Sequence, residues 1–263
     1  MLPEYKANLR ICKIFSGNFN FTLLRTRRWR AFSMPFPGFS SPLFDRLQLW
    51  DDRVPARDGA WQMAVDEALL AGPGPDPVLR IYRWTEPTLS FGYFLPYEAA
   101  LKLRHTGEAM VRRWTGGGFV HHAGAFTWTL VVPRSDAFCA LRPAMSYAGL
   151  HTGLAVALEA AGLGPVTVVP PESPAPGGGL CAGMPAPGDV MKNGRKIAGA
   201  GQRRTRSGVL HQGVIFLPET ELPASFPDLL AKALAREVQP FLAECLDGIP
   251  LARYLDPGWL MKH

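Results

Sequence analysis

One segment of this 263-residue chain combines flexible backbone with charged side chains. Arg112 and Arg113 precede the three consecutive glycines Gly116, Gly117 and Gly118, and His122 follows them. Glycines let backbone amides approach a ligand without side-chain interference, and flanking arginines can hold a carboxylate or a phosphate. The segment has neither the spacing nor the closing Lys-Ser/Thr of a P-loop, and it does not match the dinucleotide-binding fingerprint. From these residues alone, a ligand loop and a plain flexible turn are about equally good interpretations.

A second candidate is Cys181, which lies in the Pro- and Gly-dense stretch Pro170–Gly188. Neighbouring glycines leave a sulfur accessible, and a thiolate is a strong nucleophile where a nearby cation favours it. Composition alone favours an incidental small apolar residue. Cys12, Cys139 and Cys245 lack such a setting, and the sequence contains neither a CxxC pair nor a Cys/His cluster with zinc-ligand spacing. We therefore expect no metal site and no disulfide.

A third candidate is Lys196, in the stretch from Asn193 to Arg204 that also contains Gly199 and Gln202. It follows an Asn-Gly pair, which typically forms a tight hairpin turn. A solvated hairpin lysine is the more frequent outcome of such a composition. His122 and His211 could contact the same pocket, and a satisfied structural histidine is at least as frequent for each.

These residues must be positioned by elements that the residue pattern predicts. Asp58 can cap a helix over Asp58–Leu70, whose apolar residues form one face. Further helices are expected over Tyr97–Arg104, Ser146–Ala161 and, with a break at Pro240, Ala224–Leu246. Strands are expected over Val78–Trp84, Thr88–Phe94, Ala109–Trp114, Thr127–Val132 and Val209–Leu217, with a hairpin of Val190–Lys192 and Arg195–Ala200. Strands joined by hairpins and separate helices indicate one α+β domain rather than a parallel doubly wound sheet.

The net charge of +6 comes entirely from the N-terminal stretch. Residues 1–40 hold seven basic residues and one acidic residue, whereas residues 41–263 hold 21 of each. We expect residues 1–40 to be an extension, either disordered or a mis-assigned start before Met34, with an organellar transit segment as a third interpretation. Residues 41–263 form the expected domain. Its neutral balance argues against a nucleic-acid partner, no apolar run in the extension is long enough to span a membrane, and the cytoplasm is the expected location.

Five segments taken together resemble the lipoate–protein ligase and octanoyltransferase family, which shares its catalytic domain with biotin–protein ligase. They occur in the family's order over roughly residues 45–260: Trp61–Leu70, Leu79–Gly92, Arg112–His122, Gly194–Arg204 and Leu210–Ile215. The resemblance implies an α+β fold like the class II aminoacyl-tRNA synthetase core, a single domain with a mixed, mostly antiparallel sheet flanked by helices. It implies that Lys196, in its G-R-K-x-x-G context, is the essential lysine.

Two chemistries occur in this family. An ATP-dependent lipoate–protein ligase activates free lipoate or octanoate and uses ATP and Mg²⁺. A cysteine-type octanoyltransferase takes octanoate from acyl carrier protein without a cofactor, and its cysteine lies in a loop upstream of the lysine. Here the spacing from Cys181 to Lys196 resembles the cysteine-type transferases. His122 is followed by Ala123 where the ligases typically have Asp, which weakens the ligase alternative.

The resemblance therefore implies a transferase for protein lipoylation and lipoate biosynthesis. Cys181 and Lys196 are the expected catalytic pair, with the lysine favouring the thiolate or accepting its proton. The expected substrate-binding residues are Arg112, Arg113, Gly116, Gly117, Gly118, His122, Gly199, Gln202 and His211. The expected partners are acyl carrier protein and a lipoyl-acceptor domain, either glycine cleavage H protein or a 2-oxoacid dehydrogenase E2. The ligase and a non-catalytic lipoyl-domain binder stay open as alternatives.

Overall fold

The computed structural model describes residues 42–173, 185–243 and 248–262. The predicted extension, residues 1–40, and Cys181 both lie outside these ranges, so the predicted domain boundary stays a prediction. Among the described helices, none combines the length and the apolar composition that a membrane crossing requires.

An eight-stranded sheet forms the centre of the domain, in the order β11-β1-β2-β6-β10-β9-β8-β7. Its strands are β1 (Phe44–Arg57), β2 (Val78–Trp84), β6 (Ala125–Pro133), β7 (Thr167–Val168), β8 (Val190–Lys192), β9 (Arg195–Arg204), β10 (Gly208–Pro218) and β11 (Ala235–Pro240). Strand β1 pairs in parallel with β11 and β2, and the other neighbours are antiparallel. The expected mixed, mostly antiparallel sheet is confirmed.

A second sheet has three strands in the order β4-β3-β5. It consists of β3 (Thr88–Phe91), β4 (Ala109–Arg112) and β5 (Phe119–His122), and the glycine segment connects β4 to β5. The pairing of β3 with β4 is parallel and that of β3 with β5 antiparallel.

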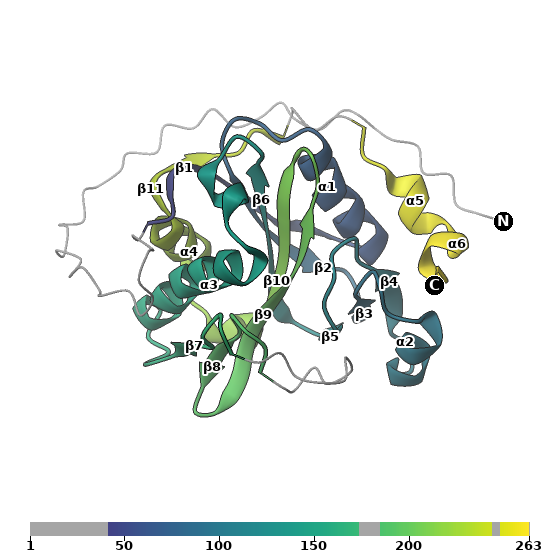
Figure 1. Cartoon of the computed structure of the whole chain (residues 1–263). Helices are drawn as coiled ribbons and strands as arrows, with labels where there is room; N and C mark the ends of the chain where they lie inside the picture. The colour runs from purple at the N-terminus through teal and green to yellow at the C-terminus, as the bar shows by residue number, and fades with distance from the viewer. Residues whose placement is uncertain (1–41, 174–184, 244–247, 263) are drawn as a thin grey trace. The chain divides into compact units, whose positions relative to one another are not determined.

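The helices cover both faces of the large sheet (Figure 1). They are α1 (Gly59–Ala71), α2 (Tyr97–Leu103), α3 (Pro143–Ala160), α4 (Phe226–Leu234), α5 (Leu251–Leu255) and α6 (Pro257–Leu260), with short 3₁₀ turns η1 (Ala137–Ala140) and η2 (Glu219–Glu221). Alternate residues of β6, including Trp128 and Leu130, pack with α3 and α4 in the largest apolar cluster. On the other face, Val65 and Leu69 of α1 pack against Val131 of β6.

Most local predictions are confirmed, because they depend on short-range rules. Asp58 caps α1 by accepting a hydrogen bond from the Trp61 amide at 2.8 Å. Asn193 and Gly194 have φ angles of 50° and 73°, as the tight hairpin between β8 and β9 requires.

The prediction of a mostly helical Ala224–Leu246 is wrong beyond Leu234. There the chain continues as β11, which pairs with β1, and β1 was itself not predicted. Strand β1 lies between two parallel neighbours, and its exposed and buried residues do not alternate regularly. Long-range pairing therefore decides both strands, and local propensity does not.

A buried polar network crosses the α1 face of the sheet. Asp66 on α1 is fully buried and accepts from Arg80 Nη1, Thr129 Oγ1 and Gln212 Nε2, each at 2.7 Å. Gln212 in turn accepts from Thr115 Oγ1 at 2.7 Å, next to the triple glycine. The network thus links α1 to three strands and to the start of the glycine segment.

We predict that Asp66→Ala lowers the free energy of unfolding by about 3–5 kcal/mol, because it leaves Arg80 buried with one of its carboxylate partners gone. The measurement is urea unfolding followed by circular dichroism. Asp76→Ala is the matched control, because it removes only the ion pair with the exposed Arg46 and should cost roughly 0–1 kcal/mol. Equal losses in the two variants would contradict the argument.

Candidate active site

Lys196 is held in place by an ion pair and is not a freely solvated lysine. Its side chain is 19% exposed, and Nζ lies 2.8 Å from Asp189 Oδ2. The same Asp189 oxygen accepts from the amide of Ala186 at 2.7 Å. One carboxylate therefore fixes both the lysine and the backbone just ahead of β8.

Gly199 provides the space for this ion pair. A Cβ built at Gly199 would lie 2.7 Å from Lys196 Cε and 2.9 Å from Asp189 Oδ1, closer than side-chain atoms pack. The pairing register of β8 with β9 shifts between Val190 and Met191, which turns Lys196 toward the same face as Gly199. A side chain at this position would therefore push the end of Lys196 away from where it now lies beside Asp189.

The glycine segment is fixed by hydrogen bonds to the residues just after β3 and to β9. The Tyr93 amide donates to Thr115 O at 2.8 Å, and the Gly116 amide donates to Gln202 O at 3.3 Å. A Cβ on Gly201 of β9 would collide with the Gly116 carbonyl, so the backbones approach closely. Gly117 has a φ of 98°, a conformation that favours glycine. The segment is an anchored loop that follows the sheet surface.

Arg113 holds this loop through hydrogen bonds. Its buried guanidinium donates to Gly118 O at 2.8 Å and to Ser90 Oγ at 2.7 Å. Burial lowers the pKa of Arg113 to about 10, and it still carries its charge at neutral pH. Its bonds indicate that it positions the loop.

His122 contacts the same serine as Arg113 does. Its Nε2 lies 2.8 Å from Ser90 Oγ, and its ring stacks on Trp84 with centroids 4.2 Å apart. Burial, followed by the positive charge of Arg113, keeps the pKa of His122 well below its usual range. His122 is therefore neutral at pH 7, and it can accept or donate a hydrogen bond without carrying charge.

Arg112 is occupied by backbone carbonyls. It is fully buried and donates to the carbonyls of Tyr93, Leu95, Trp259, Leu260 and Lys262. These bonds tie the C-terminal helix α6 and the segment after β3 to β4. The structure thus gives Arg112 the role of an anchor behind the loop.

Gln202 and His211 lie on the opposite face of the large sheet. Gln202 Nε2 lies 2.8 Å from His211 Nε2 and 2.7 Å from Ser146 Oγ of α3, whereas the adjacent Gly201 contacts the glycine loop. Side chains alternate along a strand, so neighbouring residues face opposite sides. The structure brings Lys196 and Gly199 together on one face, and it separates Gln202 and His211 from them.

Arg204 shares this second polar cluster. It donates to Cys139 O, to Ser146 Oγ and to Gln202 Oε1. Arg203 instead faces the rings of Tyr93 and Trp114, at 5.2 Å and 5.0 Å. The exposed arginines of this region are Arg195 and Arg206.

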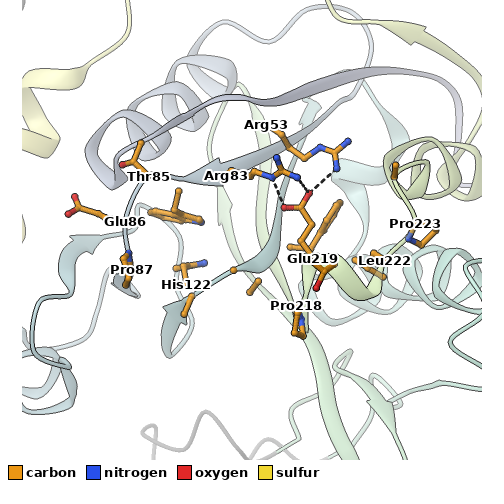
Figure 2. Close-up of a pocket in the computed structure, with 17 residues that line it drawn as sticks. Arg53, Arg83, Thr85, Glu86, Pro87, His122, Pro218, Glu219, Leu222 and Pro223 are labelled. Carbon is orange, nitrogen blue, oxygen red and sulfur yellow. Dashed lines mark hydrogen bonds and ion pairs between the residues drawn. The ribbon is translucent and has the colours of Figure 1, made fainter.

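A cavity of about 770 Å³ adjoins the site at His122 (Figure 2). Its wall includes Trp84, Phe126 and Leu222, and one side carries Glu219, which bonds to Arg53 at 2.8 Å and to Arg83 at 2.6 Å. The volume is in the range of small-molecule sites. Sequence analysis missed Ser90 as a positioning residue, because a single serine in a strand carries no signal of its own, and it did not predict that Asp189 pairs with Lys196.

Comparison with known proteins shows which family has this sequence pattern. The model of the lipoyl protein ligase A/B catalytic domain matches residues 58–241. The chain is 33% identical over 172 residues to octanoyltransferase LipM of Staphylococcus aureus, covering 61% of this chain and 62% of that protein. It is 35% identical over 173 residues to octanoyltransferase LipM of Kyrpidia tusciae, covering 60% and 62%. The matches thus span about 60% of the length of these curated relatives.

Solved structures show the same fold at lower identity. Protein Ta0514 from T. acidophilum with bound lipoic acid superposes with a TM-score of 0.61 at 19% identity, covering 84% of this chain and 99% of that one. Lipoate-protein ligase A bound with ATP gives a TM-score of 0.56 at 20% identity, covering 83% and 98%.

The neutral buried histidines predict an acid-sensitive fold. Burial lowers the pKa of His122, His151 and His211 in the folded state. Below about pH 6.5 the unfolded chain binds protons that the folded chain does not, so stability falls as pH falls, by up to about 1.4 kcal/mol per pH unit for each histidine. Urea unfolding between pH 7.5 and 5.5 measures this loss. His122→Asn should flatten the dependence by about one proton, and an equally steep dependence in that variant would contradict the assignment.

Proposed function

Because the chain belongs to the lipoyl protein ligase A/B catalytic-domain family, we propose that it is an octanoyltransferase. It moves octanoyl from acyl carrier protein to a lysine of a lipoyl-acceptor domain, through an acyl-enzyme on Cys181. The relatives named octanoyltransferase LipM support this activity. The observation that carries the proposal is the Lys196–Asp189 ion pair, which lies directly over the α-carbon of Gly199.

The chain length between the two proposed catalytic residues supports their cooperation. Cys181 lies outside the described residues, and it precedes Ala186, whose amide binds the carboxylate that holds Lys196, by five positions in the chain. Five steps along the chain span at most about 17 Å, so the chain length allows the sulfur to reach Nζ. An uninterrupted tether of this length suits a nucleophile and its proton acceptor.

The proposed reaction has two transfers. The Cys181 thiolate attacks the octanoyl thioester carbonyl, the carbon–sulfur bond to the carrier breaks, and the carrier thiolate takes the proton that Lys196 holds. The acceptor lysine amine then attacks the acyl-enzyme, so that an amide bond forms and the thioester bond to Cys181 breaks. Lys196 takes the proton that the amine loses and passes it to the Cys181 sulfur. Backbone amides of the glycine loop are the candidate donors to the oxyanion.

We predict acylation without ATP. Purified protein given octanoyl-acyl carrier protein should gain one octanoyl group, located on Cys181 by mass spectrometry and absent in Cys181→Ala. Lys196→Ala should lower transfer to the acceptor by about 10²–10⁴-fold, the range of proton-transfer catalysis. Asp189→Asn should lower the transfer rate less than Lys196→Ala does. It keeps the shape of the carboxylate and removes only the charge that holds Lys196.

Lys192→Ala is the matched control for this experiment, because Lys192 belongs to the same hairpin and has no role in the proposal. Modification that needs ATP and Mg²⁺ and persists in Cys181→Ala would replace the transferase with a lipoate–protein ligase. Retained acceptor binding with no turnover in either assay would point to a non-catalytic binder.

The partners of this reaction are acidic carrier and acceptor domains. We propose that the exposed Arg195 and Arg206, at the hairpin and at the end of β9, attract them electrostatically. A catalytic free thiol also suits the reducing cytoplasm, where we place the reaction.

We predict that Arg195→Glu with Arg206→Glu lowers kcat/KM for octanoyl-acyl carrier protein by about tenfold at low salt and weakens its salt dependence. Arg236→Glu is the control, because Arg236 is 64% exposed on β11, at the opposite end of the large sheet. An unchanged salt dependence in the double variant would remove these two arginines from the docking surface.

A further inference from the structure

Two histidines and a glutamate meet at the edge of the three-stranded sheet. His105 and Glu108 lie in the turn before β4, and His121 lies in β5. One potential ligand atom from each comes within 4.8 Å of the other two. The spacing along the chain did not indicate a site, because the group forms only when β4 and β5 pair on either side of β3.

Both imidazole rings present a nitrogen to one carboxylate. His121 Nδ1 lies 2.7 Å from Glu108 Oε1, and His105 Nδ1 lies 3.7 Å from Oε2. The rings stack with centroids 4.2 Å apart and planes 15° apart, and one potential ligand atom of each lies within 4.8 Å of the other. In a tetrahedral zinc site with bonds near 2.05 Å, ligand atoms lie about 3.3 Å apart, a value between the two observed separations.

Glu108 is buried and His105 is exposed, an arrangement that suits a metal site near the surface. Glu108 is 3% exposed, and its side chain is anchored by the His105 amide at 2.9 Å. The side chain of His105 is 73% exposed, so solvent surrounds most of it. Arg104, the nearby cation, bonds to the Glu108 carbonyl oxygen and leaves the carboxylate to the histidines.

We propose that His105, Glu108 and His121 bind a zinc-class divalent transition-metal ion, with water in the fourth position. Two imidazoles and one carboxylate suit zinc, cobalt or nickel, whereas magnesium and calcium prefer sites made only of oxygen. A rotation of His105 brings its nitrogen out of the stack and to the ion, and His121 exchanges its contact with Glu108 for a metal bond.

The ion would tie together two segments that flank the glycine loop. Glu108 immediately precedes β4, and β5, which contains His121, follows the loop. His122, which supports the loop through Ser90, is the next residue after His121. The site is therefore a structural clamp on the small sheet, and it stands independently of the acyl-transfer chemistry.

Titration of the full chain, purified without a histidine tag, tests the proposal. Zinc should bind with a one-to-one stoichiometry by calorimetry and raise Tm by several degrees, and cobalt should develop visible absorption of a tetrahedral site. Glu108→Gln and His121→Asn should each weaken zinc binding by at least tenfold and abolish the Tm increase. Magnesium and calcium should do neither.

Cysteine ligation is the main competing source of a zinc signal. Cys181→Ala should bind zinc and cobalt like the original chain, since the site contains no sulfur. Glu108→Gln keeps a side chain of the same shape, and its circular dichroism in the absence of metal shows whether it folds. Zinc binding that survives in folded Glu108→Gln and His121→Asn, is lost in Cys181→Ala, or shows cobalt–thiolate absorption would overturn the proposal. The absence of zinc binding to the original chain would overturn it as well.

Discussion

The buried carboxylate of Asp66 is the constraint on which the position of the glycine loop depends. It neutralises Arg80 inside the protein and, through Oδ2, orients Gln212, whose oxygen accepts from Thr115. A charge without water must be paired and hydrogen-bonded, so none of these groups can move alone. Helix α1, strand β10 and the loop are thus set relative to one another by polar contacts that tolerate little error. Apolar side chains on the same face could shift against one another, whereas the hydrogen-bonded groups of this network could not.

The pleat of the large sheet divides the polar residues of β9 and β10 into two sets, one on each face. On β10, Gln212 faces the loop, whereas its neighbour His211 faces α3 and contacts Gln202. The second set, which includes Ser146 and Arg204, secures α3 and η1 to the back of the sheet. A residue motif that is continuous along the chain therefore places some side chains on the face of the proposed reaction and others on the face that packs against α3. The proposed chemistry belongs to the side that carries Lys196.

Local rules predicted much of the fold, and pairing between distant segments decided the rest. The cap at Asp58 and the Asn193–Gly194 turn act within a few residues, so the sequence indicates them directly. Strand β11 has no such local cause, because it exists only through its partner β1. The same applies to the site: the motif indicated Lys196, but its partner Asp189 and the histidine–glutamate group could be found only once the strands were paired.

The spacing of glycine and lysine in the G-R-K-x-x-G motif has a steric explanation. Lys196 must bend back along β9 to reach Asp189, and the path of its last carbon passes over the α-carbon of Gly199. A β-carbon there would lie 2.7 Å from Lys196 Cε, so the end of the lysine side chain would have to shift. The ion pair in turn needs Asp189 to stay on the backbone turn that it closes with the Ala186 amide. The glycine, the lysine and the aspartate are therefore one unit, and a change in the smallest of the three displaces the other two.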